Sequence, residues 1–328
     1  MKKRFRNKCI LILTAAAILL TAVSCGSLRI RFSDAERAVF TCDSVTLNHQ
    51  EVSLIAAHYA SLFNLYYSDL AGEDFWERKA GGDMTYEQYV LQYYVQDECR
   101  ALAALNALSE RGNGRIPTAD MERLEDAAAK TYAAMTEEEK AWTGAGEKDV
   151  LSLLTKYHVA QQMIAEMLAG EKVGISEEAS RVADIQVIRM TDRLDAEDVY
   201  NRILRNENFL TLARAFSVDE TIDYSVSKSD LEEPFNTVVF AMAEGDVSEL
   251  IELDGSFYII RLTNSYNTLL SMKNGANLLA QQKYDFWSED LEVFMQDHPV
   301  GVVRQNFSDI LPSTFTEKET FALFRYFN

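Results

Sequence analysis

Apolar residues along the chain follow two periodicities, one helical and one extended. Across the first half of the chain they recur every three to four positions, the spacing of one face of an α-helix. This pattern predicts helices over 51–70, 84–108, 119–135 and 149–168. The first, EVSLIAAHYASLFNLYYSDL, carries apolar side chains on all sides, so we expect it to be buried between partners.

Polar residues ahead of the first two helices predict where each helix begins. Asn48 can cap the helix over 51–70, and the Glu51 side chain can accept a hydrogen bond from the Asn48 amide. Thr85 and Gln88 repeat this arrangement at the start of the second helix. Both pairs have the spacing of a capping box, so both helix starts are expected to be fixed locally.

Beyond residue 176 the pattern changes to alternating extended and helical segments. The stretch DIQVIRM alternates in polarity and predicts a strand over 184–190. Two helices, near 195–205 and 209–216, and two strands, near 247–253 and 257–262, complete this part. Such a mixture within about ninety residues is typical of a compact α+β unit.

The predicted fold class is therefore α+β: a mainly helical protein with a small inserted α+β domain. The low count of four prolines and fourteen glycines agrees with the helical part. A short strand is expected in AVFTCDSVTL, and a last helix from Glu317 to Tyr326. The predicted segments are a signal peptide over 1–24, a linker over 25–40, a helical region over 41–170, the α+β domain over 176–266, and a C-terminal helical segment over 267–328 that packs back on the helical region.

The first 25 residues have the organisation of an export signal. MKKRFRNK carries five basic residues, and the apolar run CILILTAAAILLTAV leads to Cys25. The exit AVSC resembles the lipobox of bacterial lipoproteins, with Ala22 where leucine is usual. The resemblance implies a lipidated Cys25 and a protein anchored outside the cytoplasm at the cell membrane. An ordinary signal peptide with an incidental cysteine is the alternative.

The charge of the chain excludes two classes of partner. The formal net charge is −19, and removing the five basic residues of 1–24 leaves 27 basic against 51 acidic residues, a net charge of −24. Nucleic-acid binding needs a basic face, and docking on anionic lipid headgroups needs basic clusters. Neither is expected here, so membrane attachment would depend on the lipid at Cys25.

The remaining cysteines and the histidines suggest no metal or cofactor. Cys42 and Cys99 lie in the exported part of the chain, where a disulfide can persist. The alternative is two separately buried thiols. The four histidines are scattered, and no Cys/His spacing matches a metal site, so neither a metal nor a cofactor is predicted.

Three motifs in the α+β domain resemble the parvulin-type peptidyl-prolyl isomerases. They are FLTLARAFSVD, EPFNTVVFAMAEGDVS and GSFYIIRL, in the order and at the spacing of that family over about eighty residues. With its helical flanks, the whole layout is similar to the PrsA- and SurA-like extracytoplasmic foldases. That resemblance implies a chaperone for unfolded or partly folded exported polypeptides, and it leaves open whether the protein forms a homodimer.

The resemblance also implies the positions of the apolar site residues. Leu231 falls where a methionine usually lines the proline pocket, and Phe235 falls on the pocket phenylalanine. Asp219 falls on the acidic or cysteine position beside the carbonyl of the rotating bond, and is the candidate catalytic residue. Either apolar residue could instead be plain core, and Asp219 could simply form the turn after a helix.

Where the family has its two histidines, this chain has Asp184 and Tyr258. If the two strands are neighbours, we expect these residues to face each other and the tyrosine hydroxyl to donate to the carboxylate. No histidine or cysteine occurs in 183–264, and the family's glycine-rich loop is replaced by IDYSVSKSD. Asp184 and Tyr258 are expected to contribute to substrate binding, in a domain whose isomerase activity is weak or absent.

Three functions remain open from the sequence. The favoured one is a lipid-anchored foldase whose isomerase-like domain binds rather than catalyses. The second is an active isomerase on X–Pro bonds of exported proteins. The third, a solute-binding lipoprotein or structural anchor, is disfavoured because such binding proteins show long βαβ alternation that is absent here.

Overall fold

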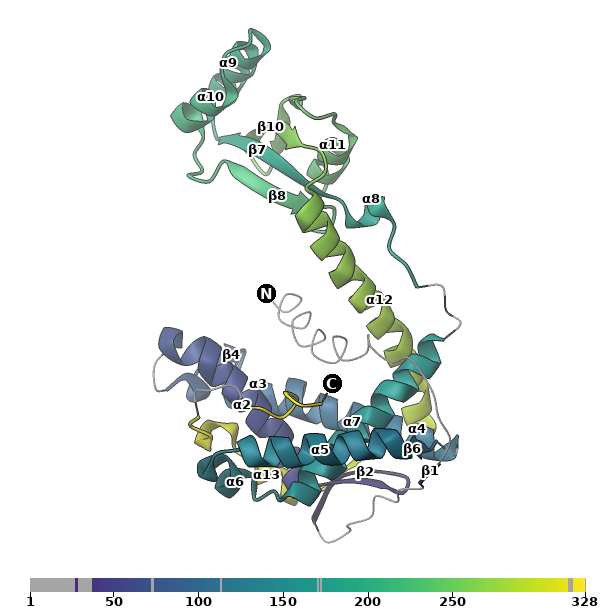
Figure 1. The fold of residues 1–328 in the computed structure, drawn as a ribbon. Helices are drawn as coiled ribbons and strands as arrows, with labels where there is room; N and C mark the ends of the chain where they lie inside the picture. Colours follow the sequence, from purple (N-terminus) through teal and green to yellow (C-terminus); the bar gives the residue numbers. More distant parts are fainter. Residues whose placement is uncertain are drawn as a thin grey trace. The chain divides into compact units, whose positions relative to one another are not determined.

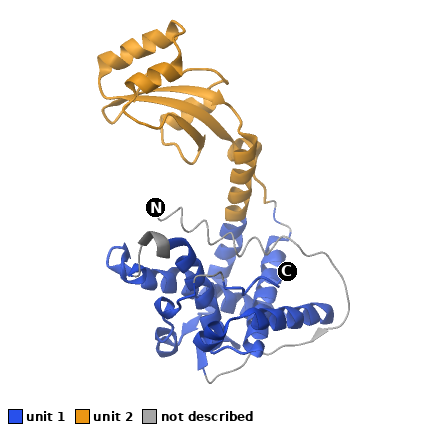
Figure 2. Cartoon of the chain, turned by 60° about the vertical axis from the view of Figure 1, so that its left-hand side comes forward, with its two compact units in different colours: residues 1–171, 283–328 blue, residues 172–282 orange. Residues whose placement is uncertain are grey.

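The protein is described here from a computed structural model, in which the chain divides into two compact units. Unit 1 comprises residues 1–171 and 283–328, and unit 2 comprises residues 172–282 (Figure 2). The signal peptide and Cys25 lie outside the described residues. The structure describes residues 27–28, 37–71, 74–112, 114–169, 171, 173–317 and 321–327.

Unit 1 consists mainly of helices (Figure 1) and also contains a small three-stranded sheet with strand order β11-β2-β3. Its strands are β1 Ser27–Leu28, β2 Ala38–Cys42, β3 Val45–Asn48, β4 Lys79–Gly81, β5 Met84–Thr85, β6 Ile116–Pro117 and β11 Gly301–Val302. Its helices are α2 His49–Ala71, η3 Phe75–Glu77, α3 Tyr86–Val90, η4 Leu91–Gln96, α4 Asp97–Arg111, α5 Thr118–Ala134, α6 Glu137–Thr143, α7 Glu147–Leu168, α13 Arg304–Ser308 and η5 Pro312–Thr314. The helix α12, Thr268–Asp297, begins in unit 2 and ends in unit 1.

The predicted helix starts are confirmed, because each depends only on neighbouring residues. The Asn48 amide donates to Glu51 at 2.9 Å, and the Glu51 amide donates to the Asn48 side chain at 2.8 Å. Thr85 and Gln88 form the second capping box in the same reciprocal way. Each box satisfies two amides that the helix itself leaves without partners.

The predicted helix over 84–108 is divided into three parts. A π-helical stretch, η4, separates α3 from α4. The stretch turns Tyr94 and Val95 into the core and leaves Tyr93 about half exposed. Hydrophobic periodicity does not distinguish such a stretch from an α-helix, because both turn a similar apolar face toward the core.

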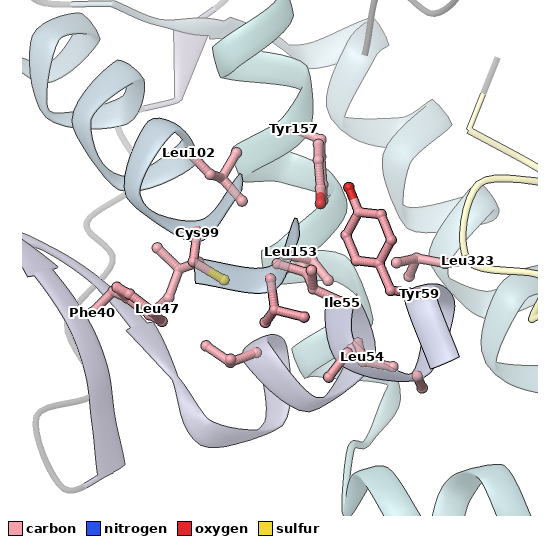
Figure 3. Close-up of a cluster of buried hydrophobic side chains, with 14 of the residues drawn as sticks. Phe40, Leu47, Leu54, Ile55, Tyr59, Cys99, Leu102, Leu153, Tyr157 and Leu323 are labelled. Atoms are coloured by element: carbon pink, nitrogen blue, oxygen red, sulfur yellow. The ribbon is translucent and has the colours of Figure 1, made fainter. Parts of the chain in front are cut away.

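The core of unit 1 is rich in aromatic residues, two of which bind the Glu98 carboxylate. The hydroxyl groups of Tyr59 and Tyr157 both donate to the Glu98 carboxylate. Burial raises the pKa of Glu98, while the two phenol hydrogen bonds act in the opposite direction. Figure 3 shows Tyr59 and Tyr157 directed toward each other within the apolar cluster, together with Leu323 from the C-terminal segment.

The two cysteines follow the second of the two alternatives that the sequence left open. Cys42 and Cys99 are both buried and both free, so the structure has two separate thiols where a disulfide was one of the two expectations. The Cys42 thiol instead donates to the backbone carbonyl of His298 at 3.4 Å. Burial raises the pKa of Cys42 to about 11, which keeps it a neutral thiol.

The end of the chain also differs from the prediction. The expected helix from Glu317 to Tyr326 is wrong for the described residues, since 323–326 form a turn and 315–317, 321–322 and 327 have no regular structure. Phe321 and Leu323 are nevertheless buried in unit 1. The apolar spacing therefore indicated correctly that side chains are buried, although the backbone that presents them is not helical.

Unit 2 carries an antiparallel four-stranded sheet with strand order β8-β7-β10-β9. The strand β8 occupies the place of the glycine-rich loop of the family and was not predicted. The two-residue turn Asp254–Gly255, with φ angles of 50° and 73°, joins β9 to β10 and suits a tight hairpin. The elements are α8 Glu177–Ser180, β7 Val182–Met190, α9 Arg193–Leu204, α10 Phe209–Phe216, β8 Asp223–Ser227, α11 Phe235–Ala241, β9 Ile251–Leu253 and β10 Ser256–Asn264.

The α+β fold class is confirmed by these two units, of which the larger is mainly helical. A search of the helices in the described part of the chain finds none with the length and apolar character that a membrane crossing requires.

Candidate functional site

The two faces of the sheet in unit 2 carry different sets of residues. Ile188 and Met190 of β7 point into a cluster with α9 and α10. Ile185 and Val187 point to the other face, into a cluster that includes side chains of α11 and the segment before it. Because side chains alternate along a strand, the odd-numbered residues of β7 share this second face. The candidate site lies on it.

The structure brings together three of the residues predicted for substrate binding. Leu231, Phe235 and Tyr258 belong to one apolar cluster, and all three are partly buried. The Phe235 and Tyr258 rings meet edge to face, with 4.9 Å between ring centroids and an interplanar angle of 75°. Such a geometry is favourable for aromatic pairs and leaves part of each ring for a ligand.

An ion pair lies beside this apolar cluster. Arg189 is opposite Tyr258 in the β7–β10 ladder, and its guanidinium holds the Asp219 carboxylate with two hydrogen bonds, of 2.8 and 2.6 Å. The two side chains are about one-third exposed, at 32% and 35%. The hydrogen bonds from Arg189 lower the pKa of Asp219, so the carboxylate stays ionised and paired.

Asp219 is positioned by the turn that follows α10. The Ser217 hydroxyl accepts from the backbone amides of both Arg189 and Asp219, at 3.2 and 3.3 Å. The Val218 amide donates to the Arg189 carbonyl at 2.8 Å. These bonds attach the turn to the end of β7 and thereby hold the side chains of Arg189 and Asp219 next to each other.

The predicted pairing of Asp184 with Tyr258 is wrong. In the ladder, Asp184 lies opposite Asn264, near the other end of β10. Its carboxylate accepts hydrogen bonds from Ser225, Asn264 and Asn267, at 2.6 to 3.1 Å. Asp184 thus connects β7 and β8 to the residue that precedes α12, at the opposite end of the strand from the ion pair.

Arg189 is the site residue that sequence reasoning missed. Alignment of short motifs placed the family's first histidine on Asp184, whereas the register of the strands puts Arg189 opposite Tyr258. The alternation of side chains along β7 indicated that Arg189 lies on the same face of the strand as Val187. The sequence alone does not show which residue of β7 lies opposite Tyr258, because the register of two strands far apart in the chain is set by long-range contacts.

The arrangement suits binding better than proton transfer. The apolar rings can enclose a proline, but the Asp219 carboxylate is already engaged by Arg189. A guanidinium has five N–H bonds, of which two are directed to Asp219, so others can reach a peptide carbonyl. Within the described ranges no group of His, Cys, Asp or Glu could hold a metal ion.

Residues 189–264 match the rotamase family, described as a PPIC-type PPIase domain. The match confirms the predicted parvulin-type domain in this part of the chain. The match begins at Arg189 and does not include Asp184. The comparison with curated proteins finds no match.

Solved structures similar to this chain include three foldases or chaperones. The foldase protein PrsA of Streptococcus pneumoniae is 16% identical, with 71% of this chain and 96% of that chain covered and a TM-score of 0.31. PrsA of Lactococcus lactis is 11% identical, with 89% and 100% covered and a TM-score of 0.31. A SurA-like chaperone of Campylobacter jejuni is 7% identical, with 82% and 100% covered and a TM-score of 0.28.

Proposed function

We propose that this protein is an extracytoplasmic, lipid-anchored foldase that holds unfolded or partly folded exported polypeptides. Its PPIC-type domain binds proline-containing segments of these clients and isomerises them weakly or not at all. Support comes from the domain match over 189–264, from the predicted lipidation of Cys25, and from the arrangement around Tyr258. The strong negative charge favours polypeptide clients over nucleic acid.

The observation that carries the binding role is the Arg189–Asp219 ion pair beside an intact apolar cluster. Rotation about an X–Pro bond crosses a barrier of ~18–20 kcal/mol, which amide resonance sets. An efficient catalyst must bind the twisted amide more tightly than the planar one. Leu231, Phe235 and Tyr258 offer apolar contact to either form, so they provide affinity without this discrimination.

The Arg189–Asp219 ion pair explains why the site would not bind the twisted amide more tightly than the planar one. A polar group assists rotation when its hydrogen bonding strengthens as the amide twists. The Asp219 oxygens each already accept a bond from Arg189, and the two charges offset each other. A hydrogen bond between the Asp219 carboxylate and the substrate would therefore compete with the bonds that Asp219 accepts from Arg189.

Two measurements on the purified protein test this proposal. Light scattering should show that near-stoichiometric protein suppresses the aggregation of a chemically unfolded client. NMR titration with a proline-containing peptide should shift the Tyr258 and Phe235 signals, whereas the same peptide with alanine for proline should not. The proposal fails if no unfolded client is protected and neither peptide binds.

The second candidate function is an active isomerase on exported proteins. The observation in its favour is that Arg189 places guanidinium N–H bonds next to Tyr258, where a rotating carbonyl could accept them. In that case replacing Asp219 by alanine should abolish turnover and leave client binding intact.

A further inference from the structure

A row of three polar residues lies buried on α2 of unit 1. His58, Ser61 and Asn64 follow one another at intervals of three, so they share one face of the helix. Each is at least nine-tenths buried. A polar group at such a position usually has a specific partner, because leaving it unpaired is costly.

Asn64 and Ser61 direct their hydrogen bonds to the backbone of the C-terminal segment. The Asn64 amide nitrogen donates to the carbonyls of Phe315 and Glu317, at 2.7 and 3.2 Å. The Ser61 hydroxyl accepts from the Phe321 amide at 3.1 Å. All three partners are main-chain groups, which every polypeptide has, so these bonds do not depend on the sequence of the segment.

Both side chains are oriented by unit 1 itself. The Trp76 indole N–H donates to the Asn64 oxygen at 3.0 Å, which leaves the amide nitrogen to face the segment. The Ser61 hydroxyl donates to the His58 carbonyl at 2.8 Å, so its lone pairs face the Phe321 amide. These side chains are thus held ready to bind a backbone, independently of which backbone occupies the face.

The His58 ring lies against the C-terminal segment, and the Phe321 backbone partly offsets the effect of burial on its pKa. Within the described part of the chain neither of its ring nitrogens has a hydrogen-bond partner. Its ring packs edge to face against Phe324, with 5.1 Å between centroids. Burial lowers the pKa of His58 to about 4, so the ring is neutral and offers one donor and one acceptor.

Side-chain contacts are supplied by aromatic and aliphatic residues of the same segment. Phe321 and Leu323 are buried, and the Phe324 ring lies against Tyr157, with 4.8 Å between centroids. The Tyr326 ring is 38% exposed. The segment is therefore an extended-to-turn stretch held by alternate apolar side chains and by its backbone, as peptides are held in recognition sites.

We propose that the part of the α2 face formed by His58 and Ser61 is a binding site for an aromatic-rich polypeptide segment of a client, and that residues 321–327 occupy it until such a segment replaces them. This inference rests on the proposed foldase function and adds the place where unit 1 holds its client. The occupant would be recognised by its main chain and by aromatic side chains spaced as in FALFRYF.

The test uses a labelled peptide of residues 321–328 and a variant that lacks these residues. A tethered segment acts at an effective concentration of about 1 mM, so for a peptide that binds the shortened variant with a Kd of about 10 µM, the intact protein should bind about a hundredfold more weakly. In the shortened variant, Ser61→Ala should weaken peptide binding about tenfold, because Ser61 accepts from the bound backbone. Ser53→Ala is the matched control, since this buried serine of α2 contacts His49 instead.

Competition with a permanently unfolded client separates this inference from the proposed function. If the client displaces the peptide from the shortened variant, the two share the face of α2. If the client binds without displacing the peptide, the inference is overturned while the foldase proposal stands. Equal peptide affinity of the intact and shortened proteins would also overturn it.

A second pair of variants in the intact chain covers the case in which the shortened protein does not fold. Phe324→Ala removes a ring that packs on His58 and Tyr157, and it should strengthen client binding several-fold by loosening the resident segment. Tyr326→Ala, in the same segment but with an exposed ring, should leave client binding unchanged. Equal client affinity in both variants and the wild type would refute the proposal.

Discussion

Replacing Phe235 by alanine should reduce both the stability of the protein and its affinity for proline-containing peptides. Phe235 is half-buried at the start of α11 and meets Tyr258 edge to face at 4.9 Å. Truncating a fully buried phenylalanine costs about 3–5 kcal/mol. For a half-buried ring we expect about 2 kcal/mol of unfolding free energy, and at least about a tenfold loss of peptide affinity.

Phe240→Ala provides the matched control for this prediction. Phe240 is also half-buried on α11, but its ring packs against Arg181 and Lys228, at 5.3 and 5.6 Å from their charged groups. Its truncation should lower stability by a similar amount and leave peptide affinity unchanged. The contrast separates a residue that contacts the ligand from one that only packs.

Urea denaturation of the intact protein would give the stability change, and NMR titration with a proline peptide would give the affinity. The reasoning is refuted if Phe235→Ala binds the peptide as tightly as the wild type. It is equally refuted if the two variants lose affinity to the same extent, because the loss would then report general destabilisation.

Three further predictions follow from the contacts in both units. Asp184→Ala should cost about 2 kcal/mol of stability, because one carboxylate accepts from three side chains, yet it should not change proline-peptide affinity in a titration. Asp219→Asn should lower stability by about 1 kcal/mol at pH 7 and by progressively less as the pH falls below the ordinary pKa of aspartate. The sign follows from the lowered pKa of Asp219, since the contribution of the Arg189 pair is present above the unfolded-state pKa and is lost as pH falls through the folded-state value. Cys42 and Cys99 should both react with a thiol reagent after unfolding without reductant, and a missing pair of labels in mass spectrometry would indicate a disulfide.

Predictions that depended on adjacent residues agree with the structure. The capping boxes at Asn48 and Thr85 are set by contacts three residues apart, which the sequence displays directly. The burial of Phe321 and Leu323 likewise follows from their apolar character, even though their backbone is not helical. The π-helical stretch η4 was not predicted, because it changes hydrogen bonding without changing which residues are apolar.

Predictions that depended on register and distant pairing failed at particular places. The motif alignment located GSFYIIRL correctly as a strand, but it could not fix which residue of β7 lies opposite Tyr258. The prediction was shifted by five positions. It placed Asp184, a structural carboxylate, opposite Tyr258, where the structure has the cation Arg189. The pairing of Arg189 with Asp219 requires the turn after α10 to return to β7, which no local pattern encodes.

The most direct test of the account is an isomerase assay of the intact protein on a proline tetrapeptide, with protease coupling or NMR exchange as the readout. The central claim is that Leu231, Phe235 and Tyr258 bind proline while the Arg189–Asp219 pair leaves the amide without assistance. The account predicts saturable binding of the peptide with an isomerisation rate near the uncatalysed background. Turnover comparable to that of an ordinary parvulin would contradict it.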